Sequence, residues 1–152
     1  MYSLKGQMKA GGEPLNRFKR KGCDMTRIRG VIQSGVGKGA FFIQVDWVVK
    51  QCRDMLGYKP FPGTLNVRVC DEDINKLEKF FESTDGVLLP DDPAFCTARV
   101  KKVVLNDIPA AIVLPSEDVN VHKNGVIEII ASMCVKDELG LEDGDPVTIS
   151  SV

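Results

Sequence analysis

Two side chains with neutral oxygen atoms, Thr64 and Asn66, stand one residue apart where a turn rich in proline and glycine runs into an alternating apolar segment. Side chains two positions apart in an extended chain lie on the same face, so both can approach one ligand. Mg²⁺ prefers oxygen ligands, and proteins often hold it with one or two groups together with waters and substrate phosphates. The pair therefore fits either a magnesium site completed by phosphates or two turn-capping side chains.

A glycine-rich stretch, Gly35-Val36-Gly37-Lys38-Gly39-Ala40, is the second candidate for chemistry. Glycines at alternate positions let backbone N–H groups approach an anion closely, and the Lys38 ammonium group adds a charge suited to a phosphate. The stretch is not a P-loop, because Ile32 stands at the first glycine of that motif and Gly39 at its Ser/Thr. Its spacing matches the dinucleotide fingerprint, but that fingerprint opens a helix and the following residues predict a strand. An anion-binding loop and a plain hairpin both remain open.

A single carboxylate, Glu128, stands inside an apolar stretch that predicts a strand over 126–131. An unpaired buried carboxylate is costly, so we expect either a polar partner at a functional site or an exposed surface position. The one histidine, His122, cannot supply a histidine metal cluster. Five scattered cysteines, no two of them two residues apart, argue against a disulfide framework and a zinc ribbon and favour a reducing compartment.

The elements that must hold these residues are short. Strands are predicted at 28–32, 40–45, 65–69, 95–105, 108–114, 126–131 and 147–150. Helical spacing predicts helices at 47–56, 74–81 and 135–139, the second of them capped by Asp71, and the proline-bearing stretch 82–93 is predicted to be a loop. About six or seven strands with two or three short helices favour a mainly β, compact barrel over a doubly wound α/β sheet.

The chain divides by charge into two parts. Residues 1–29 carry eight Lys or Arg and two Asp or Glu, whereas the whole chain has a net charge of −1. We expect residues 1–25 to form a flexible basic arm and residues 26–152 to form a single domain. A basic arm can bind nucleic acid, but a solvated tail is the more common use, so we do not expect a nucleic acid partner.

No apolar run approaches the roughly 20 residues that cross a bilayer, and we expect a cytoplasmic protein without a membrane partner.

Taken together, several blocks resemble the CTP-dependent riboflavin kinases known mainly from archaea. They are Gly35-Val36-Gly37-Lys38-Gly39-Ala40-Phe41-Phe42, Leu56-Gly57-Tyr58-Lys59-Pro60-Phe61-Pro62-Gly63-Thr64-Leu65-Asn66-Val67, Ala111 to Pro115, Glu128 to Ala131 and Leu139 to Asp145. The blocks follow the order of the family and span residues 29–149. The second block is long and specific, and it carries most of the resemblance.

The resemblance implies a six- to seven-stranded cradle-loop barrel that transfers the γ-phosphate of CTP to the ribityl hydroxyl of riboflavin, giving FMN and CDP. The phosphates of the nucleotide would be wrapped by Val36, Gly37, Lys38, Gly39, Ala40 and Phe41, and the pocket for its cytosine and ribose would be lined by Met133, Cys134, Val135 and Lys136. It further implies that Thr64 and Asn66 ligate Mg²⁺ and that Glu128 contacts the ribityl chain, orients its hydroxyl and accepts its proton. Phosphoryl transfer asks mainly for positioning and charge neutralisation, which suits these parts. We expect a monomer or a weak oligomer.

The chain departs from the family at three places. Ala40 stands where a basic residue often follows the last glycine, and Ser132 stands where a proline is usual. The segment 116–125 lacks the threonine expected to meet the flavin. These departures leave two alternatives open: a CTP-dependent kinase acting on a different small alcohol, and a non-catalytic nucleotide- or nucleic-acid-binding regulator built on the same barrel.

Overall fold

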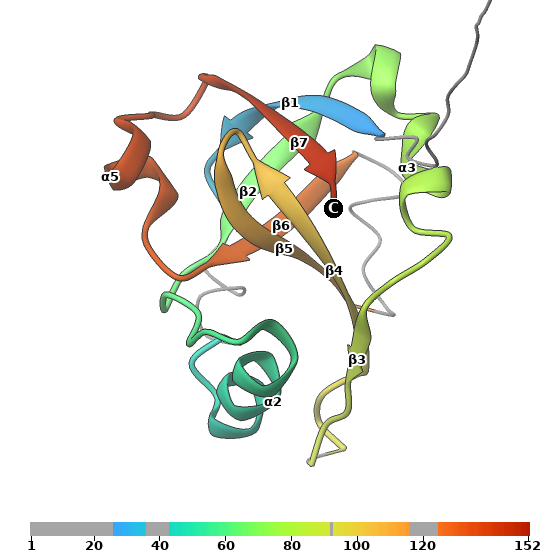
Figure 1. Ribbon diagram of the computed structural model, residues 1–152, viewed down its shortest axis with the longest axis vertical. Coiled ribbons are helices and arrows are strands. Elements are labelled where there is room, and N and C mark those ends of the chain that lie inside the picture. The colour runs from blue at the N-terminus through green and yellow to red at the C-terminus, as the bar shows by residue number, and fades with distance from the viewer. Residues whose placement is uncertain (1–25, 36–42, 92, 116–124) are drawn as a thin grey trace, which may run out of the picture.

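The computed structural model describes residues 26–35, 43–91, 93–115 and 125–152. The strands are β1 (Arg27–Gln33), β2 (Leu65–Val69), β3 (Gly86–Leu88), β4 (Ala98–Leu105), β5 (Ile108–Pro115), β6 (Val126–Ala131) and β7 (Pro146–Ser151). The helices are α2 (Asp46–Leu56), the 3-10 helix η3 (Asp71–Asp73), α3 (Lys76–Phe80) and α5 (Val135–Leu139). Figure 1 shows the strands wound around a common centre, with α2, α3 and α5 outside them.

Six of these strands close into an antiparallel barrel. Neighbouring strands follow the order β4-β5-β6-β2-β1-β7, and a further pairing of β4 with β7 completes the ring. The short strand β3 pairs with β4 and extends the sheet outside the ring. Closure pairs the edges that an open sheet would expose. The mainly β barrel predicted from the sequence is confirmed.

Two apolar clusters stabilise this arrangement. The larger one fills the barrel with side chains such as Ile32, Val67 and Ile129, which alternate along their strands. The second lies between the outer face of β4, β5 and β6 and helix α2, which contributes Val48 and Cys52. Because β5 and β6 are covered on both faces, they are apolar at nearly every position. Figure 1 shows α2 lying beneath the barrel.

Most predicted elements form close to their expected positions, and three predictions are wrong. Ile43, Gln44 and Val45 form a turn that leads into α2 and do not belong to a strand. The predicted helix 74–81 is shortened to α3, and the separate 3-10 helix η3 precedes it, so Asp71 begins η3 and does not cap the longer helix. The predicted loop 82–93 contains β3, which gains its hydrogen bonds from the edge of β4. The pairing partner that decides the last case cannot be read from local sequence.

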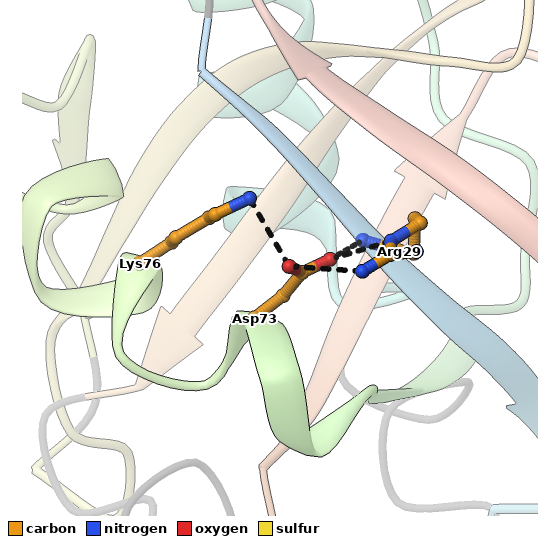
Figure 2. Close-up of polar contacts among 3 residues, drawn as sticks. All are labelled: Arg29, Asp73 and Lys76. Atoms are coloured by element: carbon orange, nitrogen blue, oxygen red, sulfur yellow. Dashed lines mark hydrogen bonds and ion pairs between the residues drawn. The ribbon is translucent and has the colours of Figure 1, made fainter.

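At one end of the barrel, Asp73 ties the segment after β2 back to β1. Its side chain is 2% exposed. It accepts hydrogen bonds from the backbone N–H of Arg29 at 2.8 Å and from Arg29 Nε at 3.1 Å, and Lys76 Nζ lies 3.1 Å from its other oxygen. Figure 2 shows the carboxylate held between the two basic side chains. The hydrogen bonds of Arg29 lower the pKa of Asp73 far below its usual range, so the group is ionised at neutral pH.

The opposite end of the barrel gathers four chain segments. Because β1 is antiparallel to both β2 and β7, and β2 to β6, the end of β1 meets the starts of β2 and β7 and the end of β6. Helix α5 follows β6 at this end, and Figure 1 places it on the side away from α3. A backbone hydrogen bond of 2.7 Å from Phe61 N to Ala131 O joins the turn before β2 to the end of β6. Segments distant in sequence thus meet here.

None of the helices within the described residues is long and apolar enough to cross a membrane.

Candidate functional site

A row of side chains crosses the outer face of the barrel near this second end. Gln33 lies opposite Asn66, and Asn66 lies opposite Glu128. Residues directly opposite each other in antiparallel strands share a face. Ile127 and Ile129, the neighbours of Glu128, point into the barrel, so Glu128 points outward. The row therefore places an amide and a carboxylate side by side on one outer surface.

Thr64 joins the same group. It lies two residues before Asn66, directly ahead of β2, and its hydroxyl donates a hydrogen bond of 3.3 Å to Glu128 Oε1. Thr64, Asn66 and Glu128 are all partly buried, so they are accessible to a ligand without being fully solvated. The structure brings together the two predicted metal ligands and the predicted acceptor-binding carboxylate.

Gly35 lies against the amide of Asn66. A Cβ atom built at Gly35 would overlap Asn66 Nδ2 and would lie 2.8 Å from Asn66 Cγ. The three atoms nearest to that Cβ position all belong to the side chain of Asn66. The absence of a side chain at Gly35 therefore decides where the Asn66 amide can sit, which the sequence did not predict.

The predicted nucleotide segment 133–136 begins two residues after β6 and leads into α5. The side chain of Val135 is 5% exposed and packs in the barrel core, so only its backbone can meet a ligand. Met133 is partly buried against the same core, and Cys134 is partly exposed as a free thiol. Lys136 points away from the core, and its Nζ lies 2.7 Å from Asp143 Oδ1. Of the residues 133–136, Lys136 is thus the one that offers a positive charge to an anionic ligand.

Asp143 connects this segment to the end of β1. Its second oxygen, Oδ2, accepts a hydrogen bond from the hydroxyl of Ser34, the residue before Gly35. The contact with Lys136, followed by that with Ser34, lowers the pKa of the Asp143 carboxyl below its usual range. Neither Ser34 nor Asp143 was predicted as a site residue; Asp143 appeared only within the block Leu139 to Asp145 that carries part of the resemblance. Long-range pairing of β1 with β7 brings them together.

A surface hollow of about 560 Å³ is lined by residues of α2 and of the segments that flank it. Its walls come from α2 and from the turn that contains Pro60 and Pro62, two residues before Thr64. Val49 and Ile43 give it apolar surface, and charged side chains of both signs line the rest, namely Lys50, Arg53, Lys59, Asp46 and Asp54. Its size is in the range of pockets that hold small organic ligands.

The donor atoms of the site suit a hard divalent cation. Thr64, Asn66 and Glu128 offer hydroxyl, amide and carboxylate oxygens, the ligand types that Mg²⁺ accepts. Among the described residues there is no cluster of three or more His, Cys, Asp or Glu side chains that would hold a metal by itself. A cation at Thr64 and Asn66 would therefore need further ligands such as phosphate oxygens. The predicted loop residues Val36, Gly37, Lys38, Gly39, Ala40 and Phe41 lie outside the described part of the chain.

Comparisons with known proteins place the chain in one family. The model of the family named CTP-dep_RFKase, described as a domain of unknown function (DUF120), matches residues 32–150. A riboflavin kinase of Methanobrevibacter smithii is 35% identical over 124 residues, which cover 81% of this chain and 98% of that protein. Riboflavin kinases of Archaeoglobus fulgidus and Saccharolobus solfataricus are each 32% identical; the match covers 83% and 80% of this chain, and 54% and 71% of those proteins. The resemblance identified from the sequence blocks is confirmed.

Proposed function

We propose that this chain, which belongs to the CTP-dependent riboflavin kinase family, transfers the γ-phosphate of CTP to riboflavin and releases FMN and CDP. The observation that carries the proposal is that Thr64, Asn66 and Glu128 lie together on one outer face. Thr64 and Asn66 come from the start of β2 and Glu128 from β6, and together they offer a group of oxygen ligands. Phosphoryl transfer needs a group that positions the donor phosphates and a group that orients the acceptor hydroxyl.

In this proposal, Thr64 and Asn66 hold Mg²⁺ through the hydroxyl and amide oxygens. Mg²⁺ bound there would neutralise charge on the donor phosphates. The two side chains carry no charge themselves, so the negative charge at the metal comes from the nucleotide. This makes metal binding depend on CTP, since the protein alone offers few charged ligands.

Glu128 acts on the acceptor. Its carboxylate lies beside Thr64 and opposite Asn66, so an alcohol bound against Glu128 lies next to the metal-binding pair. The carboxylate orients the hydroxyl and accepts its proton as the oxygen attacks the γ-phosphorus, while the bond from that phosphorus to the β-phosphate oxygen breaks and CDP leaves. A carboxylate adjacent to the attacking oxygen is sufficient for this step.

The donor nucleotide is bound by residues 36–41, through backbone N–H groups and Lys38, and by Met133, Cys134, Val135 and Lys136. Val135 contributes through its backbone, because its side chain packs in the core. The ring system of riboflavin is proposed to bind in the hollow lined by Pro60 and Pro62, because Pro62 precedes Thr64 by two residues in the chain. We also propose a monomer or weak oligomer. A location in the cytoplasm is proposed as well, and the free thiols of Cys52, Cys70, Cys96 and Cys134 support it.

The test is to incubate the protein with riboflavin and each of the four nucleoside triphosphates, with and without Mg²⁺, and to separate the flavins by chromatography. We expect FMN only with Mg²⁺, and most of it with CTP. Binding titrations of the four nucleotides should give the tightest binding for CTP. A tighter binding of ATP would contradict the donor assignment. Binding of CTP without formation of FMN would favour another alcohol as the acceptor.

A further inference from the structure

Asp143 lies where three chain segments meet at the site end of the barrel. Its Oδ1 atom faces Lys136 Nζ at 2.7 Å, and its Oδ2 atom accepts the hydrogen bond of the Ser34 hydroxyl. Ser34 follows β1 directly, Lys136 belongs to α5, and Asp143 lies in the turn before β7. One carboxylate thus fixes two side chains from separate elements.

The turn that carries Asp143 is itself held firmly against β1. Gly144 N donates to Ile32 O at 2.8 Å, and Ile32 N donates to Asp145 O at 3.0 Å. Within the turn, Glu142 N donates to Asp145 Oδ2 at 2.9 Å. Backbone bonds therefore fix the turn without help from Asp143, and the side chain of Asp143 is directed outward to Ser34 and Lys136.

The contribution of this contact to stability is expected to be small. The side chains of Lys136 and Asp143 are 38% and 44% exposed, and ion pairs exposed to this degree add little to folding. A lysine side chain has many rotamers, however, and a partner that restricts them prepares its ammonium group for a ligand. The contact therefore serves the position of Lys136 more than it serves the fold.

We propose that Asp143 is a positioning residue of the donor-nucleotide site, which holds the Lys136 ammonium group where it meets CTP. This inference rests on the proposed function, because it takes Lys136 to bind the nucleotide. Ser34 precedes Gly35, which contacts the Asn66 amide, so the same carboxylate also steadies the chain beside the metal-binding pair. Asp143 itself does not touch the substrate.

Two physical effects oppose each other when the Asp143 charge is removed, and this makes the proposal testable. Loss of a negative charge near an anionic ligand strengthens binding by electrostatics, an effect that salt screens. Loss of the positioning contact weakens binding. If positioning dominates, KM for CTP rises in Asp143→Asn; if Asp143 is only a nearby charge, KM for CTP falls, most at low salt.

The experiment measures riboflavin phosphorylation and CTP binding by calorimetry for the wild type, Asp143→Asn, Asp143→Glu and Lys136→Met. We expect Asp143→Asn to raise KM and Kd for CTP about tenfold and to leave kcat and KM for riboflavin within about twofold of the wild type. The reason is that the lost contact binds CTP equally well in the ground state and in the transition state. The melting temperature of this variant should stay within about 3 °C of the wild type. Asp143→Glu should recover most of the affinity, since it keeps the charge.

Two comparisons complete the test. Glu72→Gln removes the same charge from an exposed position in η3 at the other end of the barrel, and it should leave KM for CTP unchanged. The double variant of Asp143→Asn and Lys136→Met should bind CTP no worse than Lys136→Met alone, because both changes remove one contact. A wild type that binds CTP and makes FMN, together with an Asp143→Asn whose KM for CTP is unchanged or lower, overturns this inference alone. A wild type that binds no CTP overturns the proposed function as well.

Discussion

Two carboxylates, those of Asp73 and Glu128, lie near opposite ends of the paired strands β1 and β2, and they differ in burial and in their neighbours. Asp73 follows β2 and is buried against the start of β1, where its oxygens meet Arg29 and Lys76 (Figure 2). Glu128 lies on β6 beside the start of β2, is partly exposed, and shares its surface with the neutral side chains of Thr64 and Asn66. The oxygens of Asp73 are bonded to basic groups of the protein itself, and the carboxylate of Glu128 lies among side chains with oxygen atoms that could bind a cation.

The difference separates a structural role from a functional one. A buried carboxylate needs opposite charges and N–H donors close by, and Asp73 has both. A carboxylate that must bind an alcohol and accept a proton needs access and neighbours that can share a cation. Substitution at the Asp73 end should therefore affect stability, and substitution at the Glu128 end should affect activity.

The largest effect is expected from Asn66→Ala. The change removes an oxygen ligand from the metal-binding pair and alters no core volume, so Mg²⁺-dependent turnover should be abolished while the melting temperature is nearly unchanged. FMN formation measured against Mg²⁺ concentration checks this, with thermal unfolding as the control. Full turnover of Asn66→Ala at low Mg²⁺ would show that the ligand assignment is wrong.

Glu128→Gln tests the second carboxylate. The change keeps the shape and removes the charge, so turnover should fall by ~10²-fold or more if the carboxylate is the general base. Affinity for CTP should stay the same, which calorimetry measures. Weaker CTP binding with normal turnover would move Glu128 to the donor site, and a smaller fall in turnover with weaker riboflavin binding would reduce its role to orientation.

Two glycines near β1 offer a matched pair. The three atoms nearest to a Cβ at position 35 all belong to the end of the Asn66 side chain, so Gly35→Ala should displace the amide, lower turnover about tenfold and leave stability nearly intact. Ala at position 30 would lie 2.9 Å from the backbone oxygen of Arg68, so Gly30→Ala should lower stability instead. Kinetics and thermal unfolding of both variants test the contrast. Equal losses of stability would remove the special role of Gly35.

The sequence predicted the barrel better than it predicted the site. The alternation in Leu65–Val69 and the apolar run Val126–Ala131 identify their strands, because each face of a strand has a defined environment. Thr64, Asn66 and Glu128 were recognised from the blocks that carry the resemblance. The contacts of Gly35 and of Asp143 depend on which strands pair and in which register, and local sequence does not contain that information.

At the other end, Asp73→Asn should lower the free energy of unfolding by about 2 kcal/mol, because hydrogen bonds to a charged, buried acceptor are lost. Activity per folded molecule should be unchanged. Since the pKa of Asp73 is lower in the folded state than in the unfolded chain, its contribution is full above about pH 5 and disappears as the pH falls toward the folded-state pKa. Denaturant unfolding from pH 7 to pH 2 should therefore show the wild type and the variant converging in acid. A constant difference at all pH values would contradict this linkage.

The smallest effect is expected from removal of the basic arm. The described structure begins at Thr26, whose backbone N–H donates to the Ser151 hydroxyl at 3.0 Å and whose carbonyl accepts from Ser151 N. A chain that begins at Met25 keeps these bonds, so its melting temperature and its turnover should equal those of the full chain. A large loss of either would show that residues 1–24 dock on the barrel.

The most direct test of the central claim follows the γ-phosphate itself. CTP labelled at the γ-phosphate is incubated with riboflavin and Mg²⁺, and the label is counted in FMN for the wild type, Asn66→Ala and Glu128→Gln. The site described above predicts that label passes to FMN in the wild type and that transfer is lost or strongly reduced in both variants, although they remain folded. Undiminished transfer in both folded variants would contradict the assignment of the reaction to the Thr64, Asn66 and Glu128 group.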